Sequence, residues 1–393
     1  MWRRIEIRNF RSIEHATVDL APFTVVVGPN GSGKSNFADA LVFARDVAFD
    51  ASTAISNRGG IAGVRRWRPS KPTDVTVDVR ASASKAGLDR RYVRHNFKIH
   101  SGRRGEWSFS NEQIEVTEGG SQVTHLSRHN GTIVAEPPIS SALELTGSAM
   151  VVARQLRQFS RVSALHNVRR YRLNTDAMRQ PQLSSEETRL RESGDNIAVA
   201  VRALRTEGKI SKVVEPMTKI VPGLQDIYVD QVGRYLALKF KQAQDDDDAV
   251  ADFNATEMSE GALRALGIIV ATRQMARDEL LVIEEPEVAV HVGAASLLFE
   301  ILKEASSRGA VLVTTHSADL LDAARDEEIL VCEYASGSTK IGPLSVVQRK
   351  IVREGLFSVA ELMRSEPLRM EPEASVQRMR REDDAPQKRA NGR

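Results

Sequence analysis

The chain has 393 residues and a formal net charge of +3 at pH 7, with 41% hydrophobic and 27% charged residues. This composition is typical of a globular protein with a sizeable core, and no apolar run approaches the roughly 18 residues that a membrane-spanning helix needs. One cysteine, Cys332, excludes an internal disulfide and a cysteine-rich metal site. The first residues open into a predicted strand rather than a signal peptide, so we expect a cytoplasmic protein without membrane contact.

The first 63 residues predict three strands and a helix. Strands are expected at 4–9, 16–20 and 23–27, the last of which is a short β-branched run. A helix is expected at 36–49, where apolar residues recur with a helical period. Residues 50–63 are rich in Ser, Asn and Gly, and this composition predicts a loop.

Residues 28–35, between the third strand and the helix, match the pattern G-x-x-x-x-G-K-[ST] at each fixed position. In this context backbone N–H groups converge on phosphate oxygens, and the helix N-terminus adds partial positive charge. We expect Lys34 to reach the β- and γ-phosphates and Ser35 to ligate Mg²⁺. The alternative is a glycine-rich turn that binds nothing, but strand, spacing and helix together favour a nucleotide site. The nucleotide contacts expected in this loop are Asn30, Gly31, Ser32, Gly33, Lys34, Ser35 and Asn36.

The next stretch predicts a mostly antiparallel β region with an excess of positive charge. Alternating apolar residues indicate strands at 74–80, 91–100, 107–110, 113–117 and 132–135. Twelve Lys or Arg but only four Asp or Glu lie within residues 61–110, with aromatic residues between them. This pattern indicates either contact with nucleic acid or a solvated face of the sheet. The nucleic-acid candidates are Arg65, Arg66, Arg68, Arg91, Arg94, Arg103 and Arg104. A second basic run contains Arg154, Arg157, Arg161, Arg169, Arg170 and Arg172.

After the Pro-Pro pair at 137–138 the pattern becomes helical and then returns to strands. Helices are expected at 140–159, 186–207 and 211–220, and a strand pair at 226–230 and 234–240. Four successive Asp residues at 245–248 predict a solvated loop.

From residue 258 onward, apolar strands alternate with helices, which indicates a parallel sheet covered on both faces. The expected strands are 279–283, 310–314, 329–333 and 339–341, and the expected helices are 260–276, 292–305 and 317–324. Beyond Pro367 large apolar residues almost disappear, so the end of the chain is predicted to be unstructured.

Two of these strands end in polar residues that suit phosphoryl transfer. Glu284, at the end of 279–283, is placed to hold Mg²⁺, and Glu285 to orient or deprotonate a water. His316 follows the next strand and would stand beside the γ-phosphate. A solvated acidic turn and a structural histidine are the alternatives. Ser259 and Gly261 begin a helix that can offer a hydroxyl, an amide and its dipole to an anion, although alone this is only a helix cap.

These motifs occur in the order found in ABC-type ATPase heads, which the sequence resembles. Residues 28–35 correspond to Walker A, 259–261 to the signature motif, 281–285 to Walker B and His316 to the switch histidine. The start, residues 5–13, is similar to the first strand of RecF-type and SMC-like members. The Ile-Glu-Glu-Pro-Glu and Thr-His-Ser segments resemble the predicted-ATPase (AAA family ATPase) branch related to overcoming-lysogenisation-defect proteins. Two departures are noted: Val-Ala-Val-His-Val follows the Walker B acids where that branch has Asn-Gly-Leu-His-Pro, and no Q-loop glutamine can be placed.

The resemblance implies an α/β P-loop NTPase fold with a mixed, largely parallel sheet flanked by helices, an antiparallel β region and a helical insertion. The expected organisation is 1–63 as the first half of the ATPase head, 64–135 as a β-rich lobe, 136–224 as the helical insertion, 225–365 as the second half and 366–393 as a disordered tail. The resemblance adds Arg11 to the nucleotide-binding candidates.

The implied activity is hydrolysis of ATP with Mg²⁺, with Lys34, Glu285 and His316 as catalytic residues and Ser35 and Glu284 as metal ligands. Two heads would pair so that Ser259 and Gly261 of one contact the γ-phosphate held by the other. This ATP-gated homodimer would act on DNA or RNA or control a partner effector, in phage defence or DNA repair. The alternative is an ATP-binding scaffold or sensor with negligible turnover that regulates a partner toxin or nuclease. Fewer than 80 residues follow His316, so we expect no Toprim nuclease domain.

Overall fold

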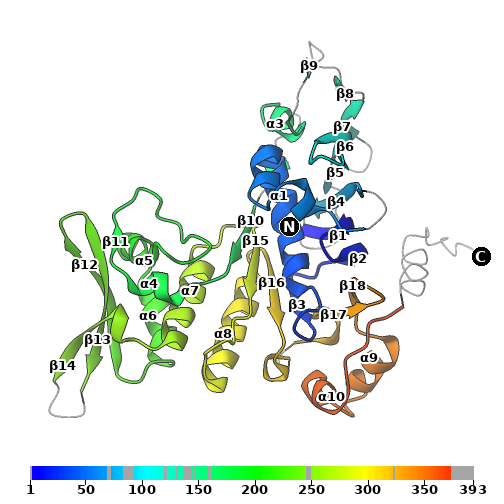
Figure 1. Ribbon diagram of the computed structural model, residues 1–393. Helices are drawn as coiled ribbons and strands as arrows, with labels where there is room; N and C mark the ends of the chain where they lie inside the picture. Colours follow the sequence, from blue (N-terminus) through cyan, green and yellow to red (C-terminus); the bar gives the residue numbers. More distant parts are fainter. Residues whose placement is uncertain are drawn as a thin grey trace, which may run out of the picture.

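A 14-stranded mixed sheet forms the body of the molecule, and a smaller four-stranded sheet stands beside it (Figure 1). The order of the large sheet is β10-β15-β16-β3-β17-β18-β2-β1-β4-β5-β6-β7-β8-β9. The computed structural model describes residues 2–68, 72–82, 92–118, 122–129, 132–136, 143–144, 147–156, 159, 162–163, 165, 167–244, 249–321 and 324–372.

The first five strands of this order run parallel and form the centre of the molecule. They are β10 (Val168–Tyr171), β15 (Leu280–Glu284), β16 (Ala310–Thr315), β3 (Phe23–Val27) and β17 (Ile329–Ala335). The four strands other than β10 lie where the apolar runs of the sequence predict them. β10 was not predicted, because it is short and carries two arginines.

The remaining strands extend the sheet away from this centre. β17 pairs antiparallel with β18 (Ser338–Pro343), which meets β2 (Ile13–Asp19) at a single parallel position. From β2 onward every pairing is antiparallel, as the alternating pattern predicts. The β-rich lobe is therefore continuous with the central sheet. Its strands are β1 (Trp2–Phe10), β4 (Val75–Ser82), β5 (Tyr92–Ser101), β6 (Trp107–Glu118), β7 (Gln122–His129), β8 (Thr132–Glu136) and β9 (Leu143–Glu144).

Two details of the lobe correct the sequence prediction. Residues 107–110 and 113–117 belong to one strand, β6, because the polar residue between them, Glu112, is fully buried rather than in a turn. Its carboxylate contacts His95 at 3.0 Å and Arg128 at 3.3 Å on the two neighbouring strands. β7 was not predicted at all.

The phosphate-binding loop leads into α1 (Lys34–Ser56), which is longer than predicted. Residues 50–56 were expected to be a loop, but Asp50 turns the chain (φ −157°, ψ 100°) and its carboxylate then caps a second helical segment by accepting hydrogen bonds from the N–H groups of Ser52 and Thr53. α2 (Ile61–Val64) follows. The expected loop is therefore mostly helical.

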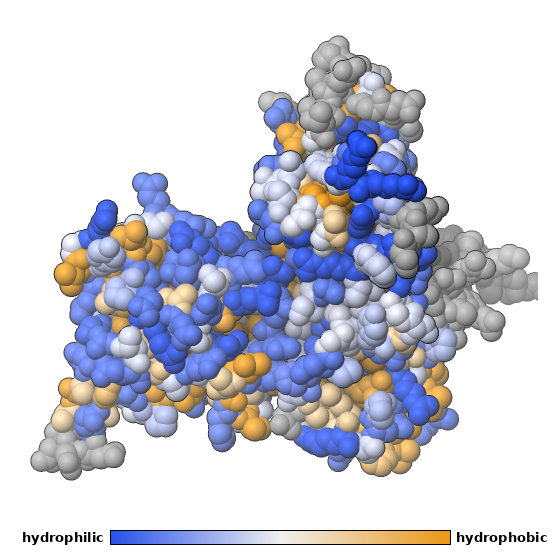
Figure 2. Space-filling view, in the orientation of Figure 1, coloured by the Kyte–Doolittle hydropathy of each residue, from blue (hydrophilic) through white to orange (hydrophobic). Residues whose placement is uncertain are grey.

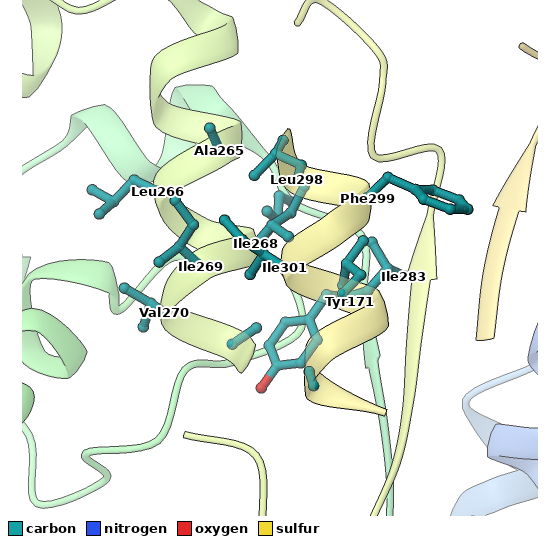
Figure 3. Close-up of a cluster of buried hydrophobic side chains, with 14 of the residues drawn as sticks. Tyr171, Ala265, Leu266, Ile268, Ile269, Val270, Ile283, Leu298, Phe299 and Ile301 are labelled. Atoms are coloured by element: carbon teal, nitrogen blue, oxygen red, sulfur yellow. The ribbon is translucent and has the colours of Figure 1, made fainter. Parts of the chain in front are cut away.

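Helices α7 (Glu260–Arg273) and α8 (Val292–Ala305) cover one face of the parallel strands, and α1 covers the other. Side chains alternate between the two cores along each strand: Ile283 faces α7 and α8, while Val282 faces α1. Figure 3 shows Tyr171 of β10 and Ile283 of β15 beside the apolar side chains of α7 and α8. The sheet thus separates two buried clusters and fixes its strands between them.

The expected helical insertion is less helical than predicted. The described part of 140–159 holds only α3 (Met150–Ala153) as an α-helix, and the helix expected to begin at 186 begins at 197 as α5 (Ile197–Thr206), because Gly194 adopts a left-handed conformation (φ 76°). α6 (Ser211–Thr218) lies where it was predicted. Between α3 and α5 the chain contributes β10 to the central sheet, then forms α4 (Thr175–Arg179) and β11 (Gln182–Leu183).

The second sheet contains the predicted strand pair and two strands that were not predicted, β11 and β14 (Val250–Asn254). β12 (Leu224–Val232) pairs with β13 (Tyr235–Ala243), and β11 and β14 share the other side of β13. The predicted acidic loop at 245–248 lies outside the described residues. In Figure 2 the visible surface is mostly hydrophilic, with apolar side chains at the β11 and β12 end of this sheet and beside α10.

The chain continues after β18 into α9 (Val346–Arg353) and α10 (Val359–Ser365). The next residues were predicted to be unstructured, but 366–372 pack against the body: Met370 forms a β-bridge with Leu344, and the Glu371 carboxylate accepts a 2.7 Å hydrogen bond from the Val346 N–H. Residues 373–393 lie outside the described part. The short helix expected at 317–324 is a 3₁₀ turn, η3 (Ala318–Leu320), and two further turns are η2 (Ala255–Glu257) and η4 (Asp326–Glu328). Of the described helices, none has the length and apolar character to cross a membrane.

A buried carboxylate, Asp39 on α1, joins four parts of the fold. It lies 3.0 Å from Arg58, 3.1 Å from Arg11 in the β1–β2 turn and 3.0 Å from Arg170 on β10. Burial raises the pKa of Asp39. The Arg58 hydrogen bond and the charges of Arg58, Arg11 and Arg170 lower this pKa by more than burial raises it, so it lies below its ordinary value. The carboxylate is therefore ionised and fully paired.

We expect Asp39→Asn to lower the free energy of unfolding by about 3–5 kcal/mol at pH 7, because three guanidinium groups lose a buried partner. The folded pKa is depressed, so this contribution is present above the unfolded pKa of about 3.9 and is lost as pH falls through the folded pKa. Urea unfolding at pH 7 and at pH 4 measures the difference. An equal loss for Asp176→Asn, an exposed i,i+3 pair, would contradict a special role for Asp39.

Candidate nucleotide-binding site

The carboxyl ends of the parallel strands meet at one edge of the sheet, which is where ligands bind in open α/β sheets. Thr315 is in register with Val27, the last residue before the phosphate-binding loop, and Glu284 is in register with Thr314. The residues after β3, β15 and β16 are therefore neighbours. The structure brings together the loop, the Glu284–Glu285 pair and His316, as the sequence predicts.

Two glycines of the loop stand where any side chain would collide with the backbone or with a neighbouring strand. A Cβ on Gly28 would lie 2.0 Å from the carbonyl oxygen of Cys332, and one on Gly33 (φ 107°) would lie 2.1 Å from the Thr339 hydroxyl. β17 and β18 thus press directly on the loop and shape it. The Thr339 hydroxyl also donates to the Ser32 carbonyl over 2.8 Å, which holds the middle of the loop.

The loop presents polar groups that can form further hydrogen bonds to a ligand. Lys34 is buried, and its Nζ donates to the carbonyl oxygens of Gly28 (2.8 Å) and Pro29 (3.1 Å). The Ser32 hydroxyl is buried without a hydrogen-bond partner among the described residues. Asn30, Gly31 and Ser35 are exposed on the loop surface. A cradle of small residues with an unsatisfied hydroxyl fits a phosphate group.

Two other nucleotide-binding candidates are engaged elsewhere. Asn36 donates to the Ser12 hydroxyl over 2.6 Å, and Ser12 contacts the Thr339 hydroxyl at 2.7 Å, so Asn36 ties the helix start to the β1–β2 turn. Arg11 adopts a left-handed conformation (φ 46°) and pairs with Asp39. Their direct contact with nucleotide stays a prediction.

Glu284 has the properties of a metal ligand. It ends β15, its side chain is only 8% exposed, and the Ser35 hydroxyl lies close enough to affect its pKa. Burial raises the pKa of Glu284 above its ordinary value, against the opposing effects of Ser35, Arg172 and Arg170. Its Oε1 has no hydrogen-bond partner in the described chain. A buried carboxylate oxygen and a hydroxyl side by side are the hard oxygen donors that Mg²⁺ prefers, so these two residues fit the ion.

Glu285 and His316 face each other at the same edge. The His316 Nδ1 lies 3.8 Å from Glu285 Oε1, and both side chains are partly exposed. Glu285 is held in a left-handed conformation (φ 47°) while its N–H donates to the Thr314 carbonyl over 2.9 Å. Strained backbone of this kind occurs where the surrounding structure fixes a functional side chain.

A third carboxylate, Glu287, supports this pair and was missed by the sequence analysis. Its Oε1 accepts hydrogen bonds from the Thr315 hydroxyl (2.6 Å) and the His316 N–H (3.3 Å), and lies 3.6 Å from His316 Nδ1. The Glu287 side chain is only 10% exposed. Glu287 therefore fixes the turn that carries His316. Its position three residues after Glu284 was the only signal in the sequence.

The predicted signature residues lie at the start of α7. Ser259 caps the helix by accepting a 3.2 Å hydrogen bond from the Ala262 N–H. A Cβ on Gly261 would lie 2.3 Å from the Ala289 carbonyl oxygen, so this glycine packs tightly against the turn that follows the Walker B acids. These contacts place Ser259 and Gly261 beside that turn and leave the exposed helix start free.

The basic residues divide into paired and unpaired groups. Arg66 pairs with Glu14, Arg94 with Asp78 and Glu115, and one guanidinium nitrogen of Arg65 is buried. Arg66 and Arg94 therefore help to hold the lobe together, whereas the buried nitrogen of Arg65 has no hydrogen-bond partner among the described residues. Contact of the candidate arginines with nucleic acid stays a prediction. Arg103 and Arg104 are exposed in the β5–β6 turn, Arg68 is partly exposed beside Glu14, and Arg91 lies outside the described residues.

The residues of the second basic run lie in several different places. Arg157 and Arg161 are outside the described residues, and Arg154 stacks on Phe49. Arg169 pairs with the fully buried Glu279 at 3.4 Å. Arg170 and Arg172 lie at the nucleotide-binding edge next to Glu284. The sequence could not reveal this placement, because β10 was not predicted and the acidic partners lie far along the chain.

Residues 23–322 match the sequence model of a family described as "AAA domain, putative AbiEii toxin, Type IV TA system". An OLD nuclease from Thermus scotoductus is 22% identical over 357 residues, which are 84% of this chain and 61% of the relative. A chromosome partition protein Smc from Synechococcus sp. is 57% identical over 119 residues, 30% of this chain and 8% of the relative. The chain spans less than two-thirds of the length of these relatives.

Solved SMC head structures share the fold. A Smc head bound to the C-terminal winged-helix domain of ScpA has a TM-score of 0.53 and 15% identity, with 88% of this chain and 99% of that chain covered. A Smc head with an extended coiled coil from Pyrococcus furiosus has a TM-score of 0.54 and 14% identity, with 90% and 99% covered. The architecture is thus that of an SMC-type P-loop head.

We expect Glu287→Ala to lower the rate constant of ATP hydrolysis about tenfold or more, with little change in KM, because His316 loses its support. Glu287→Gln keeps an oxygen that can accept the same hydrogen bonds, so it should retain most of the rate. Phosphate release at saturating ATP measures both. Equal rates in wild type and Glu287→Ala, with the fold intact by circular dichroism, would contradict this role.

Proposed function

The chain belongs to the AAA domain family whose sequence model it matches, as an SMC-type ATPase head related to OLD proteins, and we propose that it binds and hydrolyses ATP in the presence of Mg²⁺. The observation that carries this proposal is the arrangement of Glu284 and Ser35. The serine of the phosphate-binding loop lies beside a buried carboxylate, and one oxygen of that carboxylate, Oε1, has no hydrogen-bond partner among the described residues.

The residues of the chain divide the work of hydrolysis among them. Lys34 binds the β- and γ-phosphates, and Ser35 and Glu284 hold the metal ion. When bound, Mg²⁺ neutralises charge on the phosphate oxygens. Glu285 takes the proton of the attacking water or orients it, since its carboxylate is partly exposed at the same edge. His316, fixed by Glu287, faces the γ-phosphate.

ATP binding would also join two copies of the chain. Ser259 and Gly261 stand at an exposed helix start, and their contacts lie toward Ala289 rather than toward the phosphate-binding loop of their own chain. The N-terminus of α7 is therefore available to the γ-phosphate held by a second protomer. Hydrolysis would release this homodimer, so ATP acts as a switch on whatever the head controls.

The output of that switch is proposed to be a partner effector or a nucleic acid, in phage defence or DNA repair. Support comes from the toxin named in the family description and from the nuclease name of the Thermus relative. The second candidate is an ATP-binding scaffold or sensor with negligible turnover that regulates a partner toxin or nuclease. Single-turnover hydrolysis separates the two.

A nucleic-acid surface is supported by the groove beside the β1–β4 pair. The groove has a volume of about 750 Å³ and is lined in part by Arg8, Arg68, Lys98 and His100 and by one acid, Asp74, which contacts Lys98 at 3.1 Å and His100 at 3.0 Å. Trp67, next to Arg68, is 79% exposed, far more than an aromatic residue in a core. The basic residues of this lining outnumber its single acid, and a net positive groove with an exposed aromatic side chain nearby fits a single-stranded nucleic acid, whose bases stack and whose phosphates bind cations.

We expect Glu285→Gln to lower steady-state phosphate release by about 10²- to 10⁴-fold, because the water loses its base, while ATP binding persists. In mass photometry with Mg²⁺ and ATP this variant should be dimeric. Glu300→Gln, an exposed residue of α8, should behave as wild type. An unchanged rate in Glu285→Gln would reject this residue as the base, and negligible wild-type turnover would favour the scaffold.

For the groove, we expect Trp67→Ala to weaken binding of a labelled single-stranded oligonucleotide by about 5- to 100-fold, the loss of one stacked base. Fluorescence anisotropy measures the affinity, which should also fall steeply with salt. Phe357→Ala removes an exposed aromatic residue near α10 and serves as the control. An oligonucleotide affinity that changes neither in Trp67→Ala nor with salt would contradict the nucleic-acid proposal.

A further inference from the structure

A fourth strand reaches the nucleotide-binding edge and brings a cation that nothing above has used. β10 lies beside β15 in parallel register, with Tyr171 opposite Ile283. The next position after this pair is Arg172, the first residue after β10, and Glu284, the last residue of β15. Arg172 thus stands at the same edge as the metal-binding candidate, one strand away from it.

Arg170 on β10 and Arg172, the residue that follows the strand, differ in how fully they are paired. Arg170 is 15% exposed, and its guanidinium binds Asp39 at 3.0 Å and Glu192 at 2.6 Å. Arg172 is 63% exposed, and its Nε lies 3.7 Å from Glu284 Oε1, too far for a hydrogen bond. Within the described chain, Arg172 makes no side-chain hydrogen bond. Arg170 is a fixed structural cation, whereas Arg172 has all its donors available.

The main chain holds Arg172 in place while its side chain is free. The Arg172 N–H donates to the Glu192 carbonyl over 2.9 Å, and the Asn174 N–H donates to the Ser193 carbonyl over 2.8 Å. These bonds fix the segment that follows β10 against 192–193. The guanidinium can therefore change partners by side-chain rotation alone, without moving the strand.

The carboxylate oxygen that pairs with Arg172 at 3.7 Å is also the atom that a metal ion would use. Glu284 Oε1 has no hydrogen-bond partner among the described residues, and it is the oxygen that faces Arg172. If that oxygen ligates a divalent cation, Coulomb repulsion drives the guanidinium away from it. The strongest attraction then available at this edge is a polyphosphate, whose oxygens match the planar fork of an arginine.

We propose that Arg172 binds the γ-phosphate of ATP, releasing Glu284 to the metal ion, and so makes the site prefer ATP over ADP within one protomer. The inference rests on the proposed function of the site. Arg172 belongs to the nucleotide site rather than to a nucleic-acid surface.

The test compares affinities for ATPγS and ADP, both with Mg²⁺, by isothermal titration calorimetry. For Arg172→Ala we expect ATPγS to bind about 10- to 100-fold more weakly, the loss of a charge-assisted contact, and ADP within about twofold of wild type. Arg172→Lys, which keeps the charge without the fork, should fall between. Arg234→Ala removes an exposed arginine at the β12–β13 turn and should match wild type.

The possible failures are distinguishable. An unchanged ratio of ATPγS to ADP affinity in Arg172→Ala, with wild type binding both nucleotides, overturns this inference and leaves the proposed function standing. Equal weakening for both nucleotides also overturns it, because it indicates a structural role. If wild type binds neither nucleotide, the proposed function and this inference fall together.

Discussion

The parallel register of four strands sets the position of every charged group in the candidate site. β10, β15, β16 and β3 end at one edge, so residues from four distant parts of the sequence become neighbours there. The register is fixed by burial on both faces of the sheet, because a slip by one residue would move each apolar side chain into the wrong core. The chemistry of the edge therefore depends on the packing of α1 on one face and of α7 and α8 on the other.

Two carboxylates near this edge differ in how completely they are paired with arginines, and this difference separates a structural carboxylate from a candidate metal ligand. Asp39 contacts three guanidinium groups, and its pKa is depressed. It therefore links α1, the β1–β2 turn and β10 through ion pairs. Glu284 lies close by, but its cations stay beyond hydrogen-bond distance and its pKa is raised by burial. A carboxylate that is buried and incompletely paired can still bind a metal ion.

Local sequence signals predicted the site well where the chemistry is contiguous. Residues 28–35 carry their own strand and helix context, and Glu284, Glu285 and His316 each follow an apolar strand, so one sequence was enough to place them together. Glu287 could be recognised as a site residue only from its contact with His316 in the structure, because a carboxylate after a strand has no distinguishing sequence pattern.

Several features that the sequence did not reveal involve a polar residue whose partner lies on another part of the chain. Arg169, Arg170 and Arg172 form part of a basic run in the sequence, but their acidic partners Glu279, Asp39 and Glu284 are more than 100 residues away from them. Residues 107–110 and 113–117 were predicted as separate strands, because the partners of the buried Glu112, His95 and Arg128, lie on the neighbouring strands. Residues 50–63 were predicted as a loop from their composition, which does not reveal that Asp50 caps the second part of α1. None of these contacts produces a periodic pattern in the sequence.

The most direct measurement is an experimental structure of the Glu285→Gln protein with ATP and Mg²⁺. The account predicts the phosphates in the 28–35 loop, with Mg²⁺ about 2.0–2.1 Å from the Ser35 hydroxyl and bound by Glu284 directly or through one water. It also predicts the α7 start of a second protomer at the γ-phosphate. Nucleotide bound elsewhere, or a metal ion that contacts neither Ser35 nor Glu284, would contradict it.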